Sequence, residues 1–192
     1  RFFAPVIVSL CEEKNEHKIG VHISNTSFEE KQVRLNWQLT TLAGELVASG
    51  SEQYNALPQN NFMAFELDTK DYENKYGARN LIMFAQLVSA GEIISTNHCT
   101  MTVPKYLELE QPSFDLAIEE LEENKFKLTI STDKPAIMVR LEMSDSDAQF
   151  SDNFFTMYAG QTRTIIAEPW EKLSLEQFSQ QLKIKSLIDS YK

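Results

Sequence analysis

Few side chains in this chain have the types and spacing that catalysis requires. The two cysteines, Cys11 and Cys99, are far apart in the sequence, and no histidine belongs to a recognisable nucleophile motif with either of them. Two alternatives remain for these thiols: buried or edge positions, or a disulfide that joins the first and last strands of one domain. A catalytic cysteine is therefore not expected, and we assign no catalytic residue.

The three histidines, His17, His22 and His98, do not have the spacing of a metal site. Because His17 and His22 are five positions apart, a strand would point them to opposite faces. Neither H-E-x-x-H nor C-x-x-C occurs, and there is no P-loop, dinucleotide-binding fingerprint or G-x-S-x-G motif. We therefore expect no metal-binding residue, no cofactor-binding residue and no bound cofactor.

Carboxylates are abundant, and Glu119 to Glu123 (EELEE) is the densest cluster. It has two interpretations: a solvated hairpin that discourages pairing at a sheet edge, or a Ca²⁺ site, since hard cations bind carboxylate oxygens. The spacing of a calcium loop is absent. A glycosidase needs two carboxyl groups in a cleft that drives their pKa values apart, which solvated strand edges do not provide.

Two tryptophans and one sequon complete the candidates. Trp37 lies on the apolar side of an alternating run, which favours core packing over stacking on a sugar. Trp170 precedes an expected helix and is either a packed cap or part of a contact surface. Asn25-Thr26-Ser27 is an N-glycosylation sequon, and we interpret it as a turn that ends a strand.

Composition excludes several classes of protein. With 18 basic and 28 acidic residues the net charge is −10, so binding to nucleic acid is not expected. A hydrophobic content of 42% and a charged content of 24% are those of a globular protein. No apolar run approaches the roughly 20 residues of a membrane span. The start at Arg1, without Met or a signal peptide, suggests a piece of a longer protein.

Hydrophobic patterning predicts an all-β protein. Runs rich in β-branched and aromatic residues, several of them alternating, are separated by turn residues. Residues 31–41 place Val33, Leu35, Trp37 and Leu39 on one face and Arg34, Asn36, Gln38 and Thr40 on the other. The other runs in the first half are residues 17–24, 61–67 and 80–89. Short strands with such turns are typical of a β-sandwich.

A pause around Pro104 and Pro112 predicts two domains, residues 1–105 and 106–192, with net charges of −3 and −7. The second half is predicted to form strands at residues 114–120, 125–131, 136–143, 161–167 and 182–188. Ser174 and Gln177 have the spacing of a capping box, and Leu173 and Phe178 that of a hydrophobic staple, which predicts a helix from Leu175 to about Gln181. The fold class is thus two consecutive immunoglobulin-like antiparallel β-sandwiches, the second with one short helix before its last strand.

Several stretches resemble the C-terminal part of β-mannosidases of glycoside hydrolase family 2. Residues 1–6, 23–26, and Trp37 with Gly44 are similar to the first of two immunoglobulin-like domains in that family. The most specific match is Ser151 to Phe155 (SDNFF) followed by Gly160, with Ala159 where relatives often have proline. Asp152 and Asn153 are expected to form a turn, Phe154 and Phe155 to anchor it on the sandwich, and Gly160 to provide a positive φ. Residues 182–191 resemble the last strand.

The resemblance implies a non-catalytic accessory region. The parent would be a retaining exo-glycosidase that removes terminal, non-reducing β-D-mannose, with both catalytic glutamates on a (β/α)₈ barrel outside this chain. The expected partners are that barrel and the other domains of the parent, which acts on the β-mannoside. Location in the periplasm or secretion is implied by the family alone. The alternatives are a carbohydrate-binding tandem and a cell-surface protein-interaction tandem.

Overall fold

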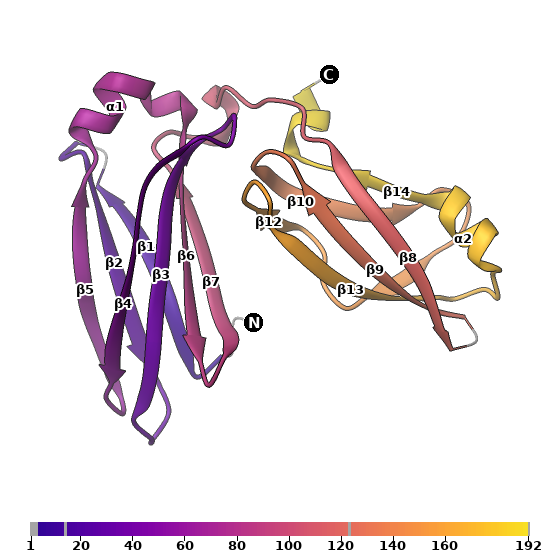
Figure 1. Ribbon diagram of the computed structural model, residues 1–192, viewed down its shortest axis with the longest axis horizontal. Coiled ribbons are helices and arrows are strands. Elements are labelled where there is room, and N and C mark those ends of the chain that lie inside the picture. Colours follow the sequence, from indigo (N-terminus) through magenta and orange to yellow (C-terminus); the bar gives the residue numbers. More distant parts are fainter. Residues whose placement is uncertain (1–3, 14, 123, 192) are drawn as a thin grey trace. The chain divides into compact units, whose positions relative to one another are not determined.

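The computed structural model describes residues 4–13, 15–122 and 124–191. The chain divides into two compact units, residues 1–108 (unit 1) and 109–192 (unit 2). Each unit has its own hydrophobic core between two β-sheets (Figure 1). Both units are antiparallel sandwiches of immunoglobulin type, so the predicted fold class is confirmed.

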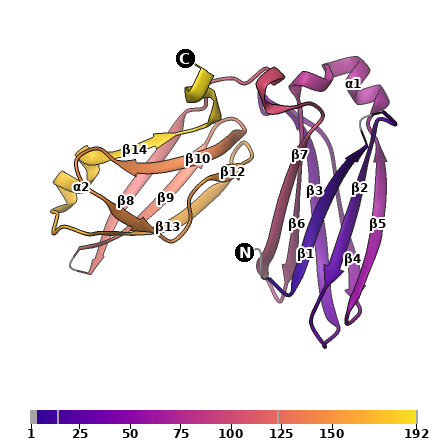
Figure 2. The same ribbon diagram turned by 180° about the vertical axis from the view of Figure 1, so that it is seen from behind.

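Unit 1 packs a three-stranded sheet, in the order β1-β2-β5, against a four-stranded sheet, in the order β4-β3-β6-β7. Figure 2 shows the three-stranded sheet in front. All strand pairs are antiparallel. The strands are β1 (Val6–Glu13), β2 (Lys18–Asn25), β3 (Lys31–Thr41), β4 (Leu46–Ala56), β5 (Asn60–Asp68), β6 (Leu81–Ser89) and β7 (Glu92–Thr100).

Alternation in β3 produces the core of unit 1. Val33, Leu35 and Leu39 are almost completely buried and face the other sheet, whereas Arg34 is exposed, as the pattern predicts. Thr40 is an exception, since it was expected on the solvated face and is buried. It is paired with Ile82 of β6, which is also buried, so this end of the sheet is covered on both faces.

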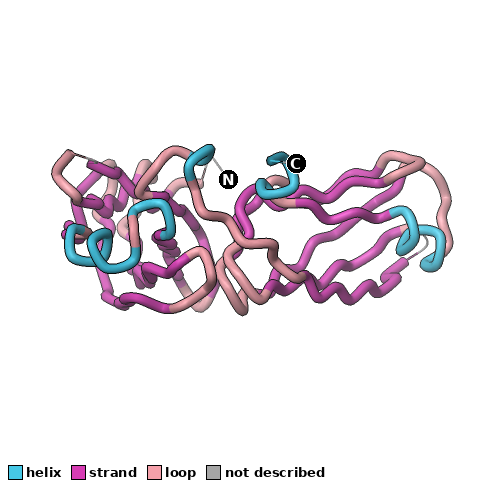
Figure 3. Tube along the Cα trace, turned by 90° about the horizontal axis from the view of Figure 1, so that it is seen from above, coloured by secondary structure: helices cyan, strands magenta, loops and turns pink. Residues whose placement is uncertain are grey.

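Unit 1 also contains helices that the sequence analysis missed. Helix α1 (Lys70–Tyr76) follows β5 and lies across one end of the strands (Figure 3). Short 3-10 helices follow it at η1 (Ala78–Asn80) and at η2 (Pro104–Tyr106). Gly77 ends α1 with a φ of 83°, and its N–H donates to the carbonyl of Glu73. This glycine was one available signal, and the other was the pair Tyr72 and Tyr76, which are four positions apart and both pack against the core of unit 1.

Unit 2 packs the sheet β12-β10-β14 against the sheet β11-β13-β9-β8. Its first long strands coincide closely with the predicted runs, and β9 alternates throughout with Phe126, Leu128 and Ile130 fully buried. The elements are β8 (Phe114–Glu122), β9 (Lys125–Thr132), β10 (Ala136–Met143), β11 (Ala148–Phe150), β12 (Phe155–Met157), β13 (Thr162–Pro169), α2 (Leu175–Gln181), β14 (Leu182–Lys185) and η3 (Leu187–Tyr191).

Helix α2 forms where its local signals predicted it. The Ser174 side chain accepts a hydrogen bond from the backbone N–H of Gln177, and the Gln177 side chain accepts one from the backbone of Ser174. Leu173 and Phe178, the expected staple pair, both belong to the core of unit 2. A seven-residue helix is too short to be stable alone, so the cap and the buried Phe178 hold it in place.

The predicted last strand is too long. Strand β14 ends at Lys185 after pairing with Arg140 to Met143 of β10, and the chain then forms η3. Ser186 marks the change, because its backbone N–H donates to the carboxylate of Asp189 and starts a helical turn. Residues 182–191 are therefore a short strand followed by a 3-10 helix.

The turn between β6 and β7 offers a stabilising substitution. Ala90 and Gly91 have φ angles of 50° and 86°, a combination in which asparagine is favoured over alanine at the first position. We expect Ala90→Asn to raise the free energy of unfolding of unit 1 by about 0.5–1 kcal/mol. Denaturation followed by Trp37 fluorescence measures it. The control is Ala43→Asn in the exposed turn after β3, where φ is negative, and an equal gain there would contradict the turn argument.

Candidate functional site

The described residues that could ligate a metal, the His, Cys, Asp and Glu side chains, are spread over the fold. Within residues 4–13, 15–122 and 124–191, no group of three or more His, Cys, Asp or Glu residues is placed to hold a metal ion. His17 lies in the turn before β2, outside the strand in which it was expected, and its Nδ1 is 2.8 Å from Oε2 of Glu73 in α1. The hydroxyl of the buried Thr69 donates to the same carboxylate. This trio fastens α1 to the β1–β2 turn.

The other two histidines lie on different sheets. His22 is on β2, where its Nε2 would be 3.1 Å from a Cβ added at Gly20, so the ring covers this glycine. His98 is on β7 with its ring centroid 6.4 Å from that of Phe84, and burial lowers its pKa. The structure therefore does not bring the three histidines together.

Cys11 and Cys99 are both free thiols on edge strands, which agrees with the first of the two alternatives for them. Cys11 on β1 is exposed, whereas Cys99 on β7 packs against the core of unit 1. Burial, together with the nearby Glu12 and Cys11, raises the pKa of Cys99 to about 12. Its thiol is therefore protonated at neutral pH and is a poor nucleophile.

This difference predicts selective labelling. We expect a disulfide reagent such as DTNB to modify one thiol per chain in the native protein at pH 8, and Cys11→Ser to abolish that reaction. Cys99→Ser is the matched control and should leave the fast reaction unchanged. In denaturant both thiols react. Rapid modification of Cys99 in the folded Cys11→Ser variant would contradict the burial argument.

The sequon asparagine is a buried structural residue. Only 1% of Asn25 is exposed. Its Nδ2 donates to the carbonyls of Glu29 and Ala56, each at 2.8 Å. Its Oδ1 accepts from the backbone N–H of Ser27 at 2.9 Å and from the Ser27 hydroxyl at 2.7 Å. Because both amide hydrogens are used inside the protein, the interpretation of Asn25-Thr26-Ser27 as a turn that ends a strand fits the structure.

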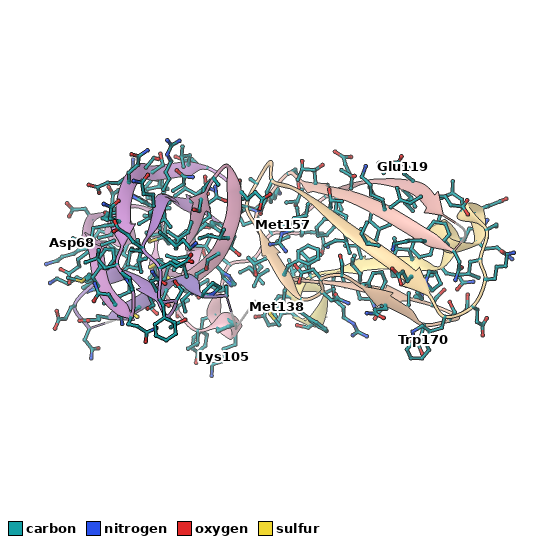
Figure 4. The ribbon with its side chains drawn as sticks, turned by 90° about the horizontal axis from the view of Figure 1, so that it is seen from below. Asp68, Lys105, Glu119, Met138, Met157 and Trp170 are labelled. Carbon is teal, nitrogen blue, oxygen red and sulfur yellow. The ribbon has the colours of Figure 1, made fainter. Side chains whose placement is uncertain are left out.

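The two tryptophans differ in their surroundings. Trp37 packs on the core with its ring centroid 5.3 Å from that of Phe65, and it occupies the space in front of Gly50, where an added Cβ would be 2.5 Å from Nε1. Trp37 is therefore a core residue. Trp170 is 75% exposed and points away from unit 2 (Figure 4), which agrees with the contact-surface alternative and not with a packed cap.

The acidic cluster forms part of a hairpin. Strand β8 continues to Glu122 and pairs with β9, and Glu119, which points outward in Figure 4, is 3.0 Å from Nζ of Lys127. Glu119 and Glu120 lie at successive positions of the strand and so point to opposite faces. This arrangement agrees with the solvated hairpin. The end of the cluster, Glu123, lies outside the described residues, as do residues 1–3 of the family resemblance.

The SDNFF motif joins the two sheets of unit 2. Asn153 acts as an extra strand residue, since its Nδ2 donates to the carbonyl of Leu141 and its Oδ1 accepts from the Leu141 N–H. Asp152 accepts a hydrogen bond of 2.7 Å from Arg163, whose guanidinium lies 4.8 Å from the centre of the Phe155 ring. The motif therefore connects β10, β12 and β13.

Two expectations for this motif have different outcomes. Phe155 is 5% exposed and anchors the segment as expected, but Phe154 is 56% exposed with a φ of 56°. The expectation that Phe154 also anchors the turn is wrong. The Phe154 backbone N–H donates to Asn153 Oδ1, which holds this position in the left-handed region and turns the side chain outward. Gly160 has the expected positive φ, 78°.

A polar hollow lies on the outer side of the four-stranded sheet of unit 1. Its volume is about 430 Å³, and it lies between the neighbouring strands β3, β4 and β6 and the β6–β7 turn. Arg34 and three amide side chains, those of Gln32, Gln53 and Asn55, line it, and no acidic residue does. Arg34 makes no ion pair with any residue that the structure describes. Such a lining can donate and accept hydrogen bonds but contains no acid–base pair.

None of the described helices is both long and apolar enough to cross a membrane.

Comparison with known proteins places each unit in a domain family. Residues 17–106 match the family model described as "Mannosidase Ig/CBM-like domain". Residues 109–190 match the Ig_mannosidase model, described as an "Ig-fold domain". The two units are therefore accessory immunoglobulin-like domains of the mannosidase families, which confirms the family resemblance.

Solved structures show the same tandem fold. β-D-Mannosidase from Dictyoglomus thermophilum matches with a TM-score of 0.77 and 20% identity over 97% of this chain and 22% of that one. The exo-chitosanase CsxA from Amycolatopsis orientalis matches with a TM-score of 0.59 and 13% identity over 95% of this chain and 25% of that one. The chain thus spans about a quarter or less of these enzymes. No curated protein matches it.

Proposed function

We propose that this chain is the C-terminal accessory region of a β-mannosidase of glycoside hydrolase family 2. Its role is structural: the two sandwiches pack against the catalytic barrel and neighbouring domains of the same parent chain and support the architecture around the active site. The parent removes terminal, non-reducing β-D-mannose by a retaining mechanism, with both catalytic glutamates on the barrel.

The observation that carries this proposal is the match of two mannosidase-type domain models, in tandem, to almost all of the chain. The chemistry of the side chains is consistent with a supporting role. The carboxylates of Glu66, Glu142 and Asp152 each pair with a lysine or arginine, and these contacts hold neighbouring strands and turns together. Carboxylates that are paired in this way hold strands and turns in position and are not arranged to activate water or a sugar.

An activity comparison tests the proposal. The longer natural chain that contains these residues should hydrolyse p-nitrophenyl β-D-mannoside, whereas the 192-residue chain alone should not. p-Nitrophenyl β-D-glucosaminide is the matched control substrate, because an exo-chitosanase shares the fold. If the longer chain prefers the glucosaminide, the proposed substrate is a β-glucosaminide and not a β-mannoside. Turnover by the 192 residues alone would contradict a non-catalytic role.

The polar hollow favours a second candidate function, the binding of a neutral saccharide. Its amide groups and Arg34 can hydrogen-bond to sugar hydroxyls without the cost of burying an acidic group. A saccharide site that relies on stacking needs exposed aromatic rings on one face, and no aromatic ring other than that of Tyr54 lines the hollow. The hydroxyl of Tyr54 is already bonded to Glu52.

Calorimetry with β-mannan oligosaccharides separates the two functions. Heat of binding that disappears in Arg34→Ala would support the saccharide site. Arg79→Ala is a matched control, since Arg79 is also exposed but lies in η1, outside the hollow. The absence of heat at millimolar oligosaccharide would remove this second candidate.

A further inference from the structure

One phenylalanine of unit 1 is almost fully exposed at the end of the sandwich opposite α1. Phe28 follows β2 and is 88% exposed, and Leu57 in the neighbouring β4–β5 connection is 50% exposed. We call residues 26–30 and 57–59 together the tip. Both connections lie at the lower end of unit 1 in Figure 1. Large exposed apolar side chains on a rigid surface are typical of protein contacts.

Hydrogen bonds make the tip rigid. The buried Asn25 amide holds Ser27 through its backbone N–H and its hydroxyl. The Gln59 backbone N–H donates to the carbonyl of Ser27 at 3.1 Å, and the Gln59 side chain donates to the carbonyl of Thr26. Gln59 itself has a φ of 50°, a backbone conformation that residues other than glycine rarely adopt without such support. Hydrogen bonds therefore hold the backbone at Ser27 and Glu29, and Phe28 lies exposed between them.

The chain enters unit 1 beside this tip. The Pro5 carbonyl, just ahead of β1, accepts a hydrogen bond of 2.8 Å from the Thr26 N–H and one of 3.2 Å from the Thr26 hydroxyl. Strand β1 begins at this end, where Val6 pairs with Asn25, and runs away from it, so the described chain enters unit 1 beside the loop that presents Phe28. The chain leaves unit 1 at the other end of the sandwich, where η2 follows β7.

We propose that the tip is the surface through which unit 1 docks onto the domain that precedes it in the parent chain. This inference rests on the proposed function for the existence of that domain. Phe28 inserts into an apolar socket, and Leu57 contacts its rim. A rigid, preformed tip loses little conformational entropy on docking, which favours a stable contact.

Charge defines the chemistry of the socket. Glu29 is paired with Lys31 at 2.8 Å, and this ammonium lowers the pKa of Glu29. Glu30 is exposed and makes no ion pair with any residue in the described part of the chain. An apolar pocket wide enough for a phenyl ring, with an arginine or lysine at its edge to meet Glu30, is therefore the complementary surface.

Hydrogen exchange of the Phe28 amide tests the inference directly. This N–H has no hydrogen-bond partner in the structure as described, so it should exchange rapidly in the 192-residue chain. In the longer parent chain we expect its exchange to slow by about tenfold or more, because the tip is covered. Phe28→Ser in the parent should abolish that protection at Glu29 and Glu30. Leu46→Ser is the matched control, since Leu46 is 57% exposed at the opposite end and its replacement should leave the protection intact.

The outcomes separate this inference from the proposed function. Equal exchange of the tip in both chains would overturn the docking surface, even if the parent hydrolyses β-mannosides. Protection that survives Phe28→Ser would overturn the role of the phenylalanine. Protection that Phe28→Ser abolishes, in a parent without β-mannosidase activity, would support the docking surface and overturn only the proposed activity.

Discussion

Replacing Asn25 by aspartate is expected to destabilise unit 1 by about 3–5 kcal/mol at pH 7. The substitution keeps the shape of the side chain but puts an oxygen where Nδ2 now donates to the carbonyls of Glu29 and Ala56. Two hydrogen bonds become repulsive contacts, and a charge is placed at a site that is 1% exposed. Thermal unfolding followed by Trp37 fluorescence should show a melting temperature lower by more than about 10 °C.

The same variant should depend on pH in a defined direction. Burial beside carbonyl oxygens raises the pKa of an aspartate above its unfolded value of about 3.9. The folded variant then holds its proton at a higher pH than the unfolded chain. Its stability relative to the wild type at the same pH is therefore greatest below the unfolded pKa and falls as pH rises through the folded one.

An exposed asparagine provides the control. Asn61 on β5 is exposed, so Asn61→Asp makes the same chemical change in water and should alter stability by no more than about 0.5 kcal/mol. If the two variants unfold alike, Asn25 is not the structural residue that its hydrogen bonds indicate.

The strands that the sequence predicts well are those with one buried and one solvated face. Strand β3 coincides with the predicted residues 31–41, and β9 alternates as expected, because burial on a single face imposes a period of two. Helix α2 was located from Ser174 and Gln177 because a capping box is a local signal. Local patterns with one physical cause are thus readable without the tertiary structure.

The elements outside the predicted runs lack such a pattern. Strand β4 carries Ser49, Gly50, Ser51 and Glu52 in succession, since an edge strand needs only a few buried side chains. Edge strands β1 and β7 were likewise not among the predicted runs, although Cys11 and Cys99 were considered as residues of a first and a last strand. Helix α1 has no fully buried residue, and the two side chains that it packs against the core, Tyr72 and Tyr76, form too short a pattern to mark a helix.

The exposure of individual side chains in loops could not be predicted from the sequence either. Trp170 and Phe154 both have large aromatic side chains, and side chains of this type are usually buried. The Trp170 backbone N–H donates to the carbonyl of Asp147, and Phe154 has a left-handed backbone conformation. Neither feature has a sequence signature. The Asn25 sequon was correctly interpreted as a turn, but one of its four hydrogen bonds goes to the carbonyl of Ala56, which is 31 positions away and has no signal in the local sequence.

Truncating Phe178 is expected to have the largest effect in unit 2. The side chain is fully buried and lies parallel to Phe126, with ring centroids 4.2 Å apart and an interplanar angle of 10°. Phe178→Ala should cost about 3–5 kcal/mol, because it removes the stacked ring and leaves a cavity in the core. It also removes the only buried residue of α2, so the helix loses its attachment.

Calorimetric unfolding of the whole chain measures this cost, and the signals of the two units can be told apart by comparison with Asn25→Asp. Phe154→Ala is the matched control, since that ring is 56% exposed and its removal should change stability by no more than about 0.5 kcal/mol. Phe178→Leu keeps most of the buried surface and should fall between the two. If Phe178→Ala unfolds at the same temperature as Phe154→Ala, the capping box, and not the buried ring, holds α2 on the sandwich.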